Sequence, residues 1–314
     1  MGATTRSFAI APLGAFSLAE SALFGFGQRM RPAGVGAQEP TFDGVMRLAF
    51  CVDGYRDQVG VELRQDARQG SSGDAEPDGA EVHAVVHGDA PLDAVQRQVE
   101  RVLSLDHDAR GFDELGRLDP VVARLQAAAP GLRPPLFYSP YEAAAWSVLS
   151  ARRPGWQMAT VRAALSEAHG ATFTLAGERL AALPTPEHLL AVASFPGIDD
   201  TRLARLHGVA AAALDGQLDV DRLRSLGPEA ALADVQRITG IGPFYASLIV
   251  IRATGFTDVL PTSEPKALEL AGELYGLPHA ATAAELEAIA QAWRPWRTWV
   301  TVLLRAAGGR LLAR

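Results

Sequence analysis

A glycine turn between two apolar helices is the part of this sequence best suited to bind a phosphate. It lies in residues 232–251, LADVQRITGIGPFYASLIVI, where Gly240, Ile241 and Gly242 form the turn and Pro243 suits the first turn of the second helix. Glycine permits a left-handed backbone and a close approach. The N-terminus of a helix presents unpaired N–H groups and the positive end of the dipole. The segment therefore predicts a helix–hairpin–helix that can hold a DNA backbone without reading bases.

The same pattern is equally typical of an ordinary αα-hairpin that turns on glycine. The overall charge does not decide between the two interpretations. The chain has 36 Asp and Glu against 29 Lys and Arg, with a net charge of −7, which argues against a surface that coats nucleic acid as a whole. A local groove remains compatible with this charge, because a phosphate site made of backbone amides needs few basic side chains.

Asp258 and Glu264 follow the hairpin in residues 257–270, TDVLPTSEPKALEL. Glu264 precedes a proline and a helical pattern, and the helix dipole favours an acid at that position. On spacing alone, Glu264 is therefore a helix-terminal acid. Asp258 is predicted to be a structural cap.

The order of these elements resembles the helix–hairpin–helix DNA glycosylase superfamily. GIGPFYA, a gap of about ten residues and then DVLPTSE carry the resemblance, which is strongest to the bacterial 3-methyladenine DNA glycosylase II (alkylation-repair) branch. Three further segments occur in the family's order: VLSLDHDARGFDELGRLDPVVARLQAAAPGLRPP, FPGIDDTRLARLHGVA and WRPWRTW. The resemblance spans roughly residues 20–307.

The resemblance implies that Glu264, where the family has an aspartate, is the catalytic carboxylate. Breaking an N-glycosidic bond develops positive charge on the deoxyribose, and a fixed anion stabilises that charge and orients the attacking water. Glutamate keeps the charge but adds one methylene, and a displacement near 1 Å can cost on the order of a hundredfold in rate. Lyase-type relatives have a nucleophilic lysine where this chain has Phe244, so a monofunctional hydrolase is implied. Lys266, the single lysine, has the spacing of a surface residue.

The resemblance also implies which residues replace and hold a flipped base. Arg152 and Arg153 occupy the plug turn, from which the family inserts a side chain into the gap left by the base, usually a glutamine. Arg152 either fills this gap by stacking and contacts phosphates, or it forms a solvated pair with Arg153. Aromatic walls suit a cationic purine. The predicted base pocket consists of Phe244, Trp296 and Phe26. The predicted DNA contacts are Gly240, Ile241, Gly242, Arg152, Arg153 and Arg297.

The elements that must position these residues predict an α+β fold. A small antiparallel β unit with helices comes first, and a mostly α-helical helix–hairpin–helix core follows. Alternating apolar residues predict strands at 44–52, 58–64 and 81–87. A polar composition predicts a long loop over 65–80, and apolar residues on one face predict an amphipathic helix over 91–105. From about residue 112 the pattern is helical with almost no strand signal. We expect two domains, residues 1–110 and residues 111–314.

These observations predict a monofunctional DNA glycosylase that hydrolyses the N-glycosidic bond of alkylated bases of the 3-methyladenine or 7-methylguanine type, in base excision repair. The alternative is a catalytically weakened or inactive homologue that acts as a DNA- or lesion-binding module. Glutamate at position 264 and the missing glutamine favour that alternative. A third interpretation is a helical interaction protein without a DNA role.

The same observations also predict the partners and cofactors of the protein. The expected partner is double-stranded DNA with a damaged base, bound by a monomer that is cytoplasmic and associated with the nucleoid. No cofactor is expected, and no side-chain pattern indicates a metal site; by resemblance, the hairpin carbonyls could hold a monovalent ion. A single cysteine, Cys51, excludes an intrachain disulfide. No run of about 18 apolar residues indicates a membrane span.

Overall fold

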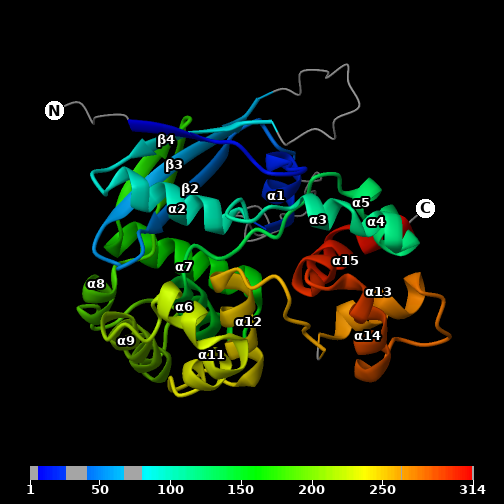
Figure 1. Ribbon diagram of the computed structural model, residues 1–314. Coiled ribbons are helices and arrows are strands. Elements are labelled where there is room, and N and C mark those ends of the chain that lie inside the picture. Colours follow the sequence, from blue (N-terminus) through cyan, green and yellow to red (C-terminus); the bar gives the residue numbers. More distant parts are fainter. Residues whose placement is uncertain (1–5, 26–40, 67–79, 263, 313–314) are drawn as a thin grey trace.

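The computed structural model describes residues 6–25, 41–66, 80–262 and 264–312. It has an α+β fold in which a small antiparallel sheet lies on a larger helical body (Figure 1). This confirms the predicted fold class. Within the described ranges, no helix combines the length and apolar character needed to cross a membrane.

The sheet has the strand order β1–β4–β3–β2, with antiparallel neighbours. Its strands are β1 (Arg6–Ile10), β2 (Met46–Cys51), β3 (Gln58–Gln65) and β4 (Val82–His87). Helix α2 (Leu92–Val102) packs on one face through the buried Val95 and Val99. The predicted strands 44–52, 58–64 and 81–87 and the predicted helix are confirmed, whereas β1 was not predicted. Most of the predicted loop over 65–80 lies outside the described residues.

A second, two-stranded sheet lies in the part of the chain that was predicted to be mostly α-helical with almost no strand signal. Strands β5 (Thr172–Leu175) and β6 (Glu178–Ala181) form a hairpin that packs against β2 and β3. Gly60 in β3 makes room for it, because a Cβ there would lie 2.7–2.8 Å from the side chains of Phe173 and Leu175. Since side chains alternate along a strand, this hairpin covers the sheet face opposite α2. The four-residue strands are too short for a clear alternation signal.

The helices form two lobes with separate hydrophobic cores. The middle lobe contains α6 (Pro140–Ser150), α7 (Gly155–His169), α8 (Pro186–Leu190), α9 (Asp200–Leu214), α10 (Val220–Leu226), α11 (Pro228–Val235) and α12 (Pro243–Thr254). The terminal lobe contains α3 (Arg110–Asp113), α4 (Leu115–Leu118), α5 (Pro120–Ala128), α13 (Pro265–Leu274), α14 (Ala283–Ile289), the 3₁₀ turn Ala290–Trp293 and α15 (Arg297–Leu312). Helix α1 (Leu18–Gly25) places Phe24 against the terminal lobe.

The chain enters the terminal lobe, leaves it for the middle lobe and returns to complete it (Figure 1). The boundary at residue 110 coincides with the start of α3. The two-domain division itself stays a prediction.

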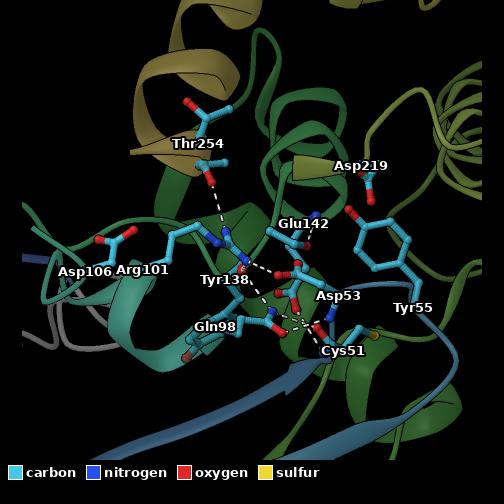
Figure 2. Close-up of polar contacts among 12 residues, drawn as sticks. Cys51, Asp53, Tyr55, Gln98, Arg101, Asp106, Tyr138, Glu142, Asp219 and Thr254 are labelled. Carbon is cyan, nitrogen blue, oxygen red and sulfur yellow. Dashed lines mark hydrogen bonds and ion pairs between the residues drawn. The ribbon is translucent and has the colours of Figure 1, made fainter. Parts of the chain in front are cut away.

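A buried polar network joins the sheet unit to the middle lobe (Figure 2). Arg101 of α2 is 3% exposed, pairs with Asp53 in the turn after β2, and donates to the carbonyl of Ala253 at 3.0 Å. Gln98, one turn earlier, donates to the carbonyl of Tyr138 at 3.0 Å. Burial raises the pKa of Asp53, although the arginine opposes this effect. The guanidinium therefore depends on one carboxylate and on backbone carbonyls for its compensation.

Removing that carboxylate should destabilise the whole fold. In Asp53→Ala, Arg101 keeps its charge in a buried position without its anionic partner, and we expect the free energy of unfolding to fall by about 3 kcal/mol. Urea unfolding followed by circular dichroism measures this. The matched control is Asp93→Ala, which breaks an exposed pair with Arg97 on the same helix and should change stability much less. Equal losses in the two variants would contradict the assignment.

Candidate active site

The predicted hairpin is present, with α11 and α12 joined by a turn at Gly240. Gly240 has φ +95°, which is a left-handed conformation that glycine adopts readily. Ile241 anchors the turn by burial in the middle-lobe core. Gly242 is the N-cap of α12, and a Cβ there would meet no atom within 4 Å. The first-turn amides of α12 therefore lie beside open space, at the positive end of a 12-residue helix.

Two arginines on α9 connect this hairpin to the predicted plug turn. Arg205 packs against the hairpin, so that a Cβ on Gly240 would lie 2.8 Å from its Cδ atom. Arg202, three residues earlier, donates to the carbonyls of Leu149 at 2.9 Å and Ala151 at 3.2 Å. The hairpin and the turn after α6 are therefore held at the same end of the middle lobe.

The plug turn presents its basic residues to solvent. Arg152 and Arg153 are both exposed, and Arg152 has φ +56°. Trp156, at the start of α7, is 61% exposed and was not predicted as a site residue. Its position directly after a basic turn was the signal in the sequence, but a single tryptophan is more often a core residue. The structure thus adds an exposed aromatic side chain to the predicted arginine pair.

A cavity of about 270 Å³ opens between the two lobes. One wall comes from α12, through residues spaced along one helical face: Phe244, Ser247, Leu248, Ile251 and Arg252. The opposite wall comes from α15 and consists of Thr298, Thr301, Val302 and Arg305. Phe24, Pro261 and Glu264 complete the described lining.

Glu264 lies at this cavity as the N-cap of α13. One carboxylate oxygen accepts from the amide of Ala267 at 2.6 Å, and the other accepts from the Nη1 atom of Arg305. The side chains of Glu264 and Arg305 are 27% and 37% exposed. Glu264 therefore caps a helix, as its spacing predicted, and also faces a cavity, whereas its catalytic role stays a prediction. The contact between Arg305 and Glu264 was not predicted, because α15 meets residue 264 only through tertiary packing.

Of the three predicted pocket aromatics, the structure places one at the cavity. Phe244 lines the cavity and is 61% exposed. Phe26 lies outside the described residues, whereas Phe24, two positions earlier, lines the cavity. Trp296 was predicted to line the base pocket, but it does not line the cavity. It is buried in the terminal-lobe core, with its ring centroid 4.7 Å from that of Trp299. Its aromatic character serves core packing.

Arg297 was predicted to contact DNA directly, but in the structure it forms an ion pair with Asp258. Its side chain is only 16% exposed, and its Nε atom donates to the carboxylate of Asp258 at 2.6 Å. Arg294 donates to the same carboxylate at 2.7 Å. Asp258 is therefore structural, as predicted, but as the acceptor for two arginines. This ion-pair group fixes the segment that leads to Glu264.

Other candidate chemistry lies away from the cavity. Lys266 pairs with Glu269 at 2.5 Å on the surface of α13. Within the described part of the chain, the one group of three neighbouring metal-type side chains is Asp66, Glu81 and His83, all exposed. None of them lines the cavity. The predicted monovalent ion at the hairpin carbonyls stays a prediction.

No family model and no curated protein matches the chain, but solved structures do. The 3-methyladenine DNA glycosylase from Archaeoglobus fulgidus has a TM-score of 0.71 at 18% identity, over 97% of this chain and 99% of that one. The 8-oxoguanine glycosylase/lyase from Clostridium acetobutylicum has a TM-score of 0.57 at 14% identity, over 82% and 86%. The DNA-3-methyladenine glycosidase from Bacillus halodurans has a TM-score of 0.52 at 20% identity, over 66% and 93%.

These likenesses establish the fold. The chain has the architecture of DNA glycosylases, over nearly the full length of the Archaeoglobus fulgidus protein. The resemblance inferred from the hairpin and the DVLPTSE element implied this fold, and the structure has it.

The two glycines of the hairpin should respond differently to alanine. Gly240→Ala forces a left-handed conformation on a residue with a Cβ and presses that atom against Arg205, so we expect a loss of about 1–2 kcal/mol in the free energy of unfolding. Gly242→Ala should leave stability nearly unchanged, because its φ is −87° and its Cβ points into open space. Chemical denaturation of both variants tests this. A larger loss in Gly242→Ala would show that the turn is described wrongly.

Proposed function

We propose that this protein is a monofunctional DNA glycosylase that hydrolyses the N-glycosidic bond of alkylated bases in double-stranded DNA. The observation that carries the proposal is the position of Glu264. Its carboxylate lies at a cavity, and one wall of this cavity is formed by α12, the helix that begins at the hairpin. Alkylated bases follow from the sequence resemblance and from neighbours named as 3-methyladenine enzymes. Another neighbour is named for 8-oxoguanine, so the fold supports glycosylase chemistry more directly than it supports a particular base.

The cavity and the carboxylate together fit hydrolysis at C1′. When the C1′–N bond breaks, its electron pair leaves with the base nitrogen and positive charge develops on the sugar. The Glu264 carboxylate stabilises that charge and orients a water, whose oxygen bonds to C1′ while a proton passes through the carboxylate to the departing base or to solvent. The amide of Ala267 and Arg305 fix the two oxygens, which keeps the anion in place.

The DNA backbone would bind at the end of the middle lobe that carries the hairpin and the turn after α6. The amides at the N-terminus of α12 offer a phosphate site, and Arg152 and Arg153 supply positive charge on the neighbouring turn. Phe244 stands where lyase-type relatives have a lysine, which supports hydrolysis without a covalent imine.

One observation favours a non-catalytic lesion-binding module as a second candidate. Both oxygens of Glu264 already accept hydrogen bonds, one in a helix cap and one in an ion pair. A carboxylate in that state has less freedom to reach a sugar, so the DNA-binding surface could persist without catalysis.

Base release distinguishes these candidates. Duplexes that carry 7-methylguanine or 3-methyladenine are incubated with the protein under single-turnover conditions, and the free base is quantified. Glu264→Gln keeps an acceptor for the Ala267 amide but removes the charge, so we expect release to fall by about 10²–10³-fold with thermal unfolding little changed. Glu285→Gln is the matched control, because Glu285 is also a capping acid, in α14, and does not line the cavity.

The outcomes separate enzyme from binding module. Equal release by the wild type and Glu264→Gln would retain the activity and reject Glu264 as its catalyst. No release, together with tight and salt-sensitive binding of alkylated or abasic duplex, would establish the lesion-binding module.

Duplex binding tests the hairpin separately. Gly242→Ala places a methyl group where a phosphate would approach the α12 amides, and we expect about a tenfold weaker affinity. Since no cationic side chain is lost, the dependence of affinity on salt should keep its slope, whereas Arg152→Ala should make it shallower. Fluorescence anisotropy at several salt concentrations measures both. Gly208→Ala, at another glycine with open space, is the control, and an equal effect there would contradict the phosphate site.

A further inference from the structure

We propose that Trp156 stacks on the DNA bases at the gap left by a flipped base, and that Arg152 and Arg153 contact the phosphates beside it. The proposal rests on the proposed glycosylase function and deepens it, because it assigns the side chain that fills the duplex. The sequence left two interpretations of Arg152 open, and this assignment gives it phosphate contact without gap filling. Three features support it: the exposed indole, the backbone of the plug turn and the attachment of both to α9.

Trp156 keeps its indole in solvent, 61% exposed, at the start of α7. Trp293 and Trp299 show the more usual placement of this side chain, because both are buried in a core. An indole presents a flat face that can stack on any base, since every base has a π face. Arg152 and Arg153, in the turn before the helix, are exposed as well. A stacking surface beside positive charge matches unpaired nucleotides, which combine exposed bases with an anionic backbone.

The backbone of the plug turn indicates a role for the Arg152 side chain. Ala151 has φ −54° and ψ 118°, Arg152 has φ +56°, and the amide of Arg153 donates to the carbonyl of Ser150 at 3.1 Å. This is the pattern of a type II turn, whose second central position favours glycine or asparagine. Arginine occupies that position at a cost in backbone strain. The guanidinium therefore explains this residue better than the backbone does, and phosphate is a ligand to which a guanidinium is well suited.

Arg202 of α9 holds the plug turn and the start of α7 in place. Its guanidinium donates to the carbonyls of Leu149 and Ala151 and to the Sδ atom of Met158 at 3.9 Å. Met158, two residues after Trp156, is buried in the middle-lobe core. One side chain thus connects both ends of the plug turn. An indole on a fixed helix has fewer torsions to immobilise than an arginine, so stacking through Trp156 has the smaller entropic cost.

The position of Trp156 relative to the cavity separates it from the flipped base. Phe244, which is equally exposed, lines the cavity, whereas Trp156 is not among the described lining residues. Arg202 and Arg205 hold the plug turn and the hairpin at the same end of the middle lobe. A duplex whose phosphate is bound at the α12 amides would therefore lie against the plug turn. The flipped base would meet Phe244, and the bases that stay in the duplex would meet Trp156.

Binding of an abasic duplex tests this stacking without catalysis, because an abasic site leaves a gap among the bases. Fluorescence anisotropy compares it with an undamaged duplex of the same sequence. Trp156→Ala should weaken binding of the abasic duplex about tenfold or more and leave binding of the undamaged duplex nearly unchanged, since stacking needs the gap. Trp156→Phe keeps an aromatic ring and should restore most of the affinity. Arg152→Gly, which suits the backbone of the turn, should weaken binding of both duplexes alike and make the salt dependence shallower.

Tryptophan emission gives an independent measurement on the same complexes. Stacking of an indole on a base quenches its emission, and the exposed Trp156 is accessible to a base in a way that the buried indoles are not. We expect the abasic duplex to quench the emission of the wild type and of Arg152→Gly. Trp156→Phe should lose most of this quenching while it still binds the duplex.

The control is Leu118→Ala, which removes an exposed apolar side chain from α4 in the terminal lobe and should change the binding of neither duplex. Equal losses for the two duplexes in Trp156→Ala, or quenching that persists in Trp156→Phe, would overturn the assignment of Trp156 and leave the glycosylase intact. A loss confined to the abasic duplex in Arg152→Gly would return gap filling to Arg152. A wild type that binds neither duplex would overturn the proposed function, and this proposal with it.

Discussion

The arrangement of the site depends on how the C-terminal end of α12 is held. Arginine side chains from other parts of the chain donate to its last carbonyls: Arg101 to Ala253 at 3.0 Å and Arg224 to Thr254 at 2.5 Å. Cations at a helix C-terminus satisfy unpaired carbonyls and interact favourably with the dipole. With that end fixed to the sheet unit (Figure 2), the other end of α12 presents the hairpin amides, and its side faces the cavity. One helix thus links the buried network, the proposed phosphate site and the cavity.

Much of the fold could be predicted because its signals are local. The glycine turn at residues 240–242, the proline and cap residues of the helices and the alternation in β2, β3 and β4 each depend on neighbouring residues. The β5–β6 hairpin was not predicted, because its strands are only four residues long. Its position depends on packing against Gly60 of β3, which is distant in the sequence. The division of the helices into two cores also depends on contacts between distant segments, since α3–α5 pack with α13–α15.

The site could be predicted only where a sequence pattern fixed it. Glu264 and Phe244 belong to the family's ordered elements, and both lie at the cavity. The sequence did not show which other aromatic residues line the cavity. A tryptophan before a helix, such as Trp296, suits a core as well as a pocket, and in the structure it packs with Trp299 in the core. No local pattern placed Arg305 beside Glu264. It becomes a site residue only because α15 and the N-terminus of α13 meet across 41 residues of sequence.

The glutamate in place of aspartate is best understood together with that arginine. The longer side chain of Glu264 turns back to cap its own helix, with its carboxylate 2.6 Å from the Ala267 amide, so the added methylene is absorbed in the cap. The second oxygen then meets Arg305. An anion bound on both sides loses mobility but keeps its charge near the cavity, and the proposed hydrolysis needs a charge that is held in place in this way. Glu264 therefore belongs both to the cap of α13 and to an ion pair with α15, so a change at either residue of the pair affects the position of the carboxylate.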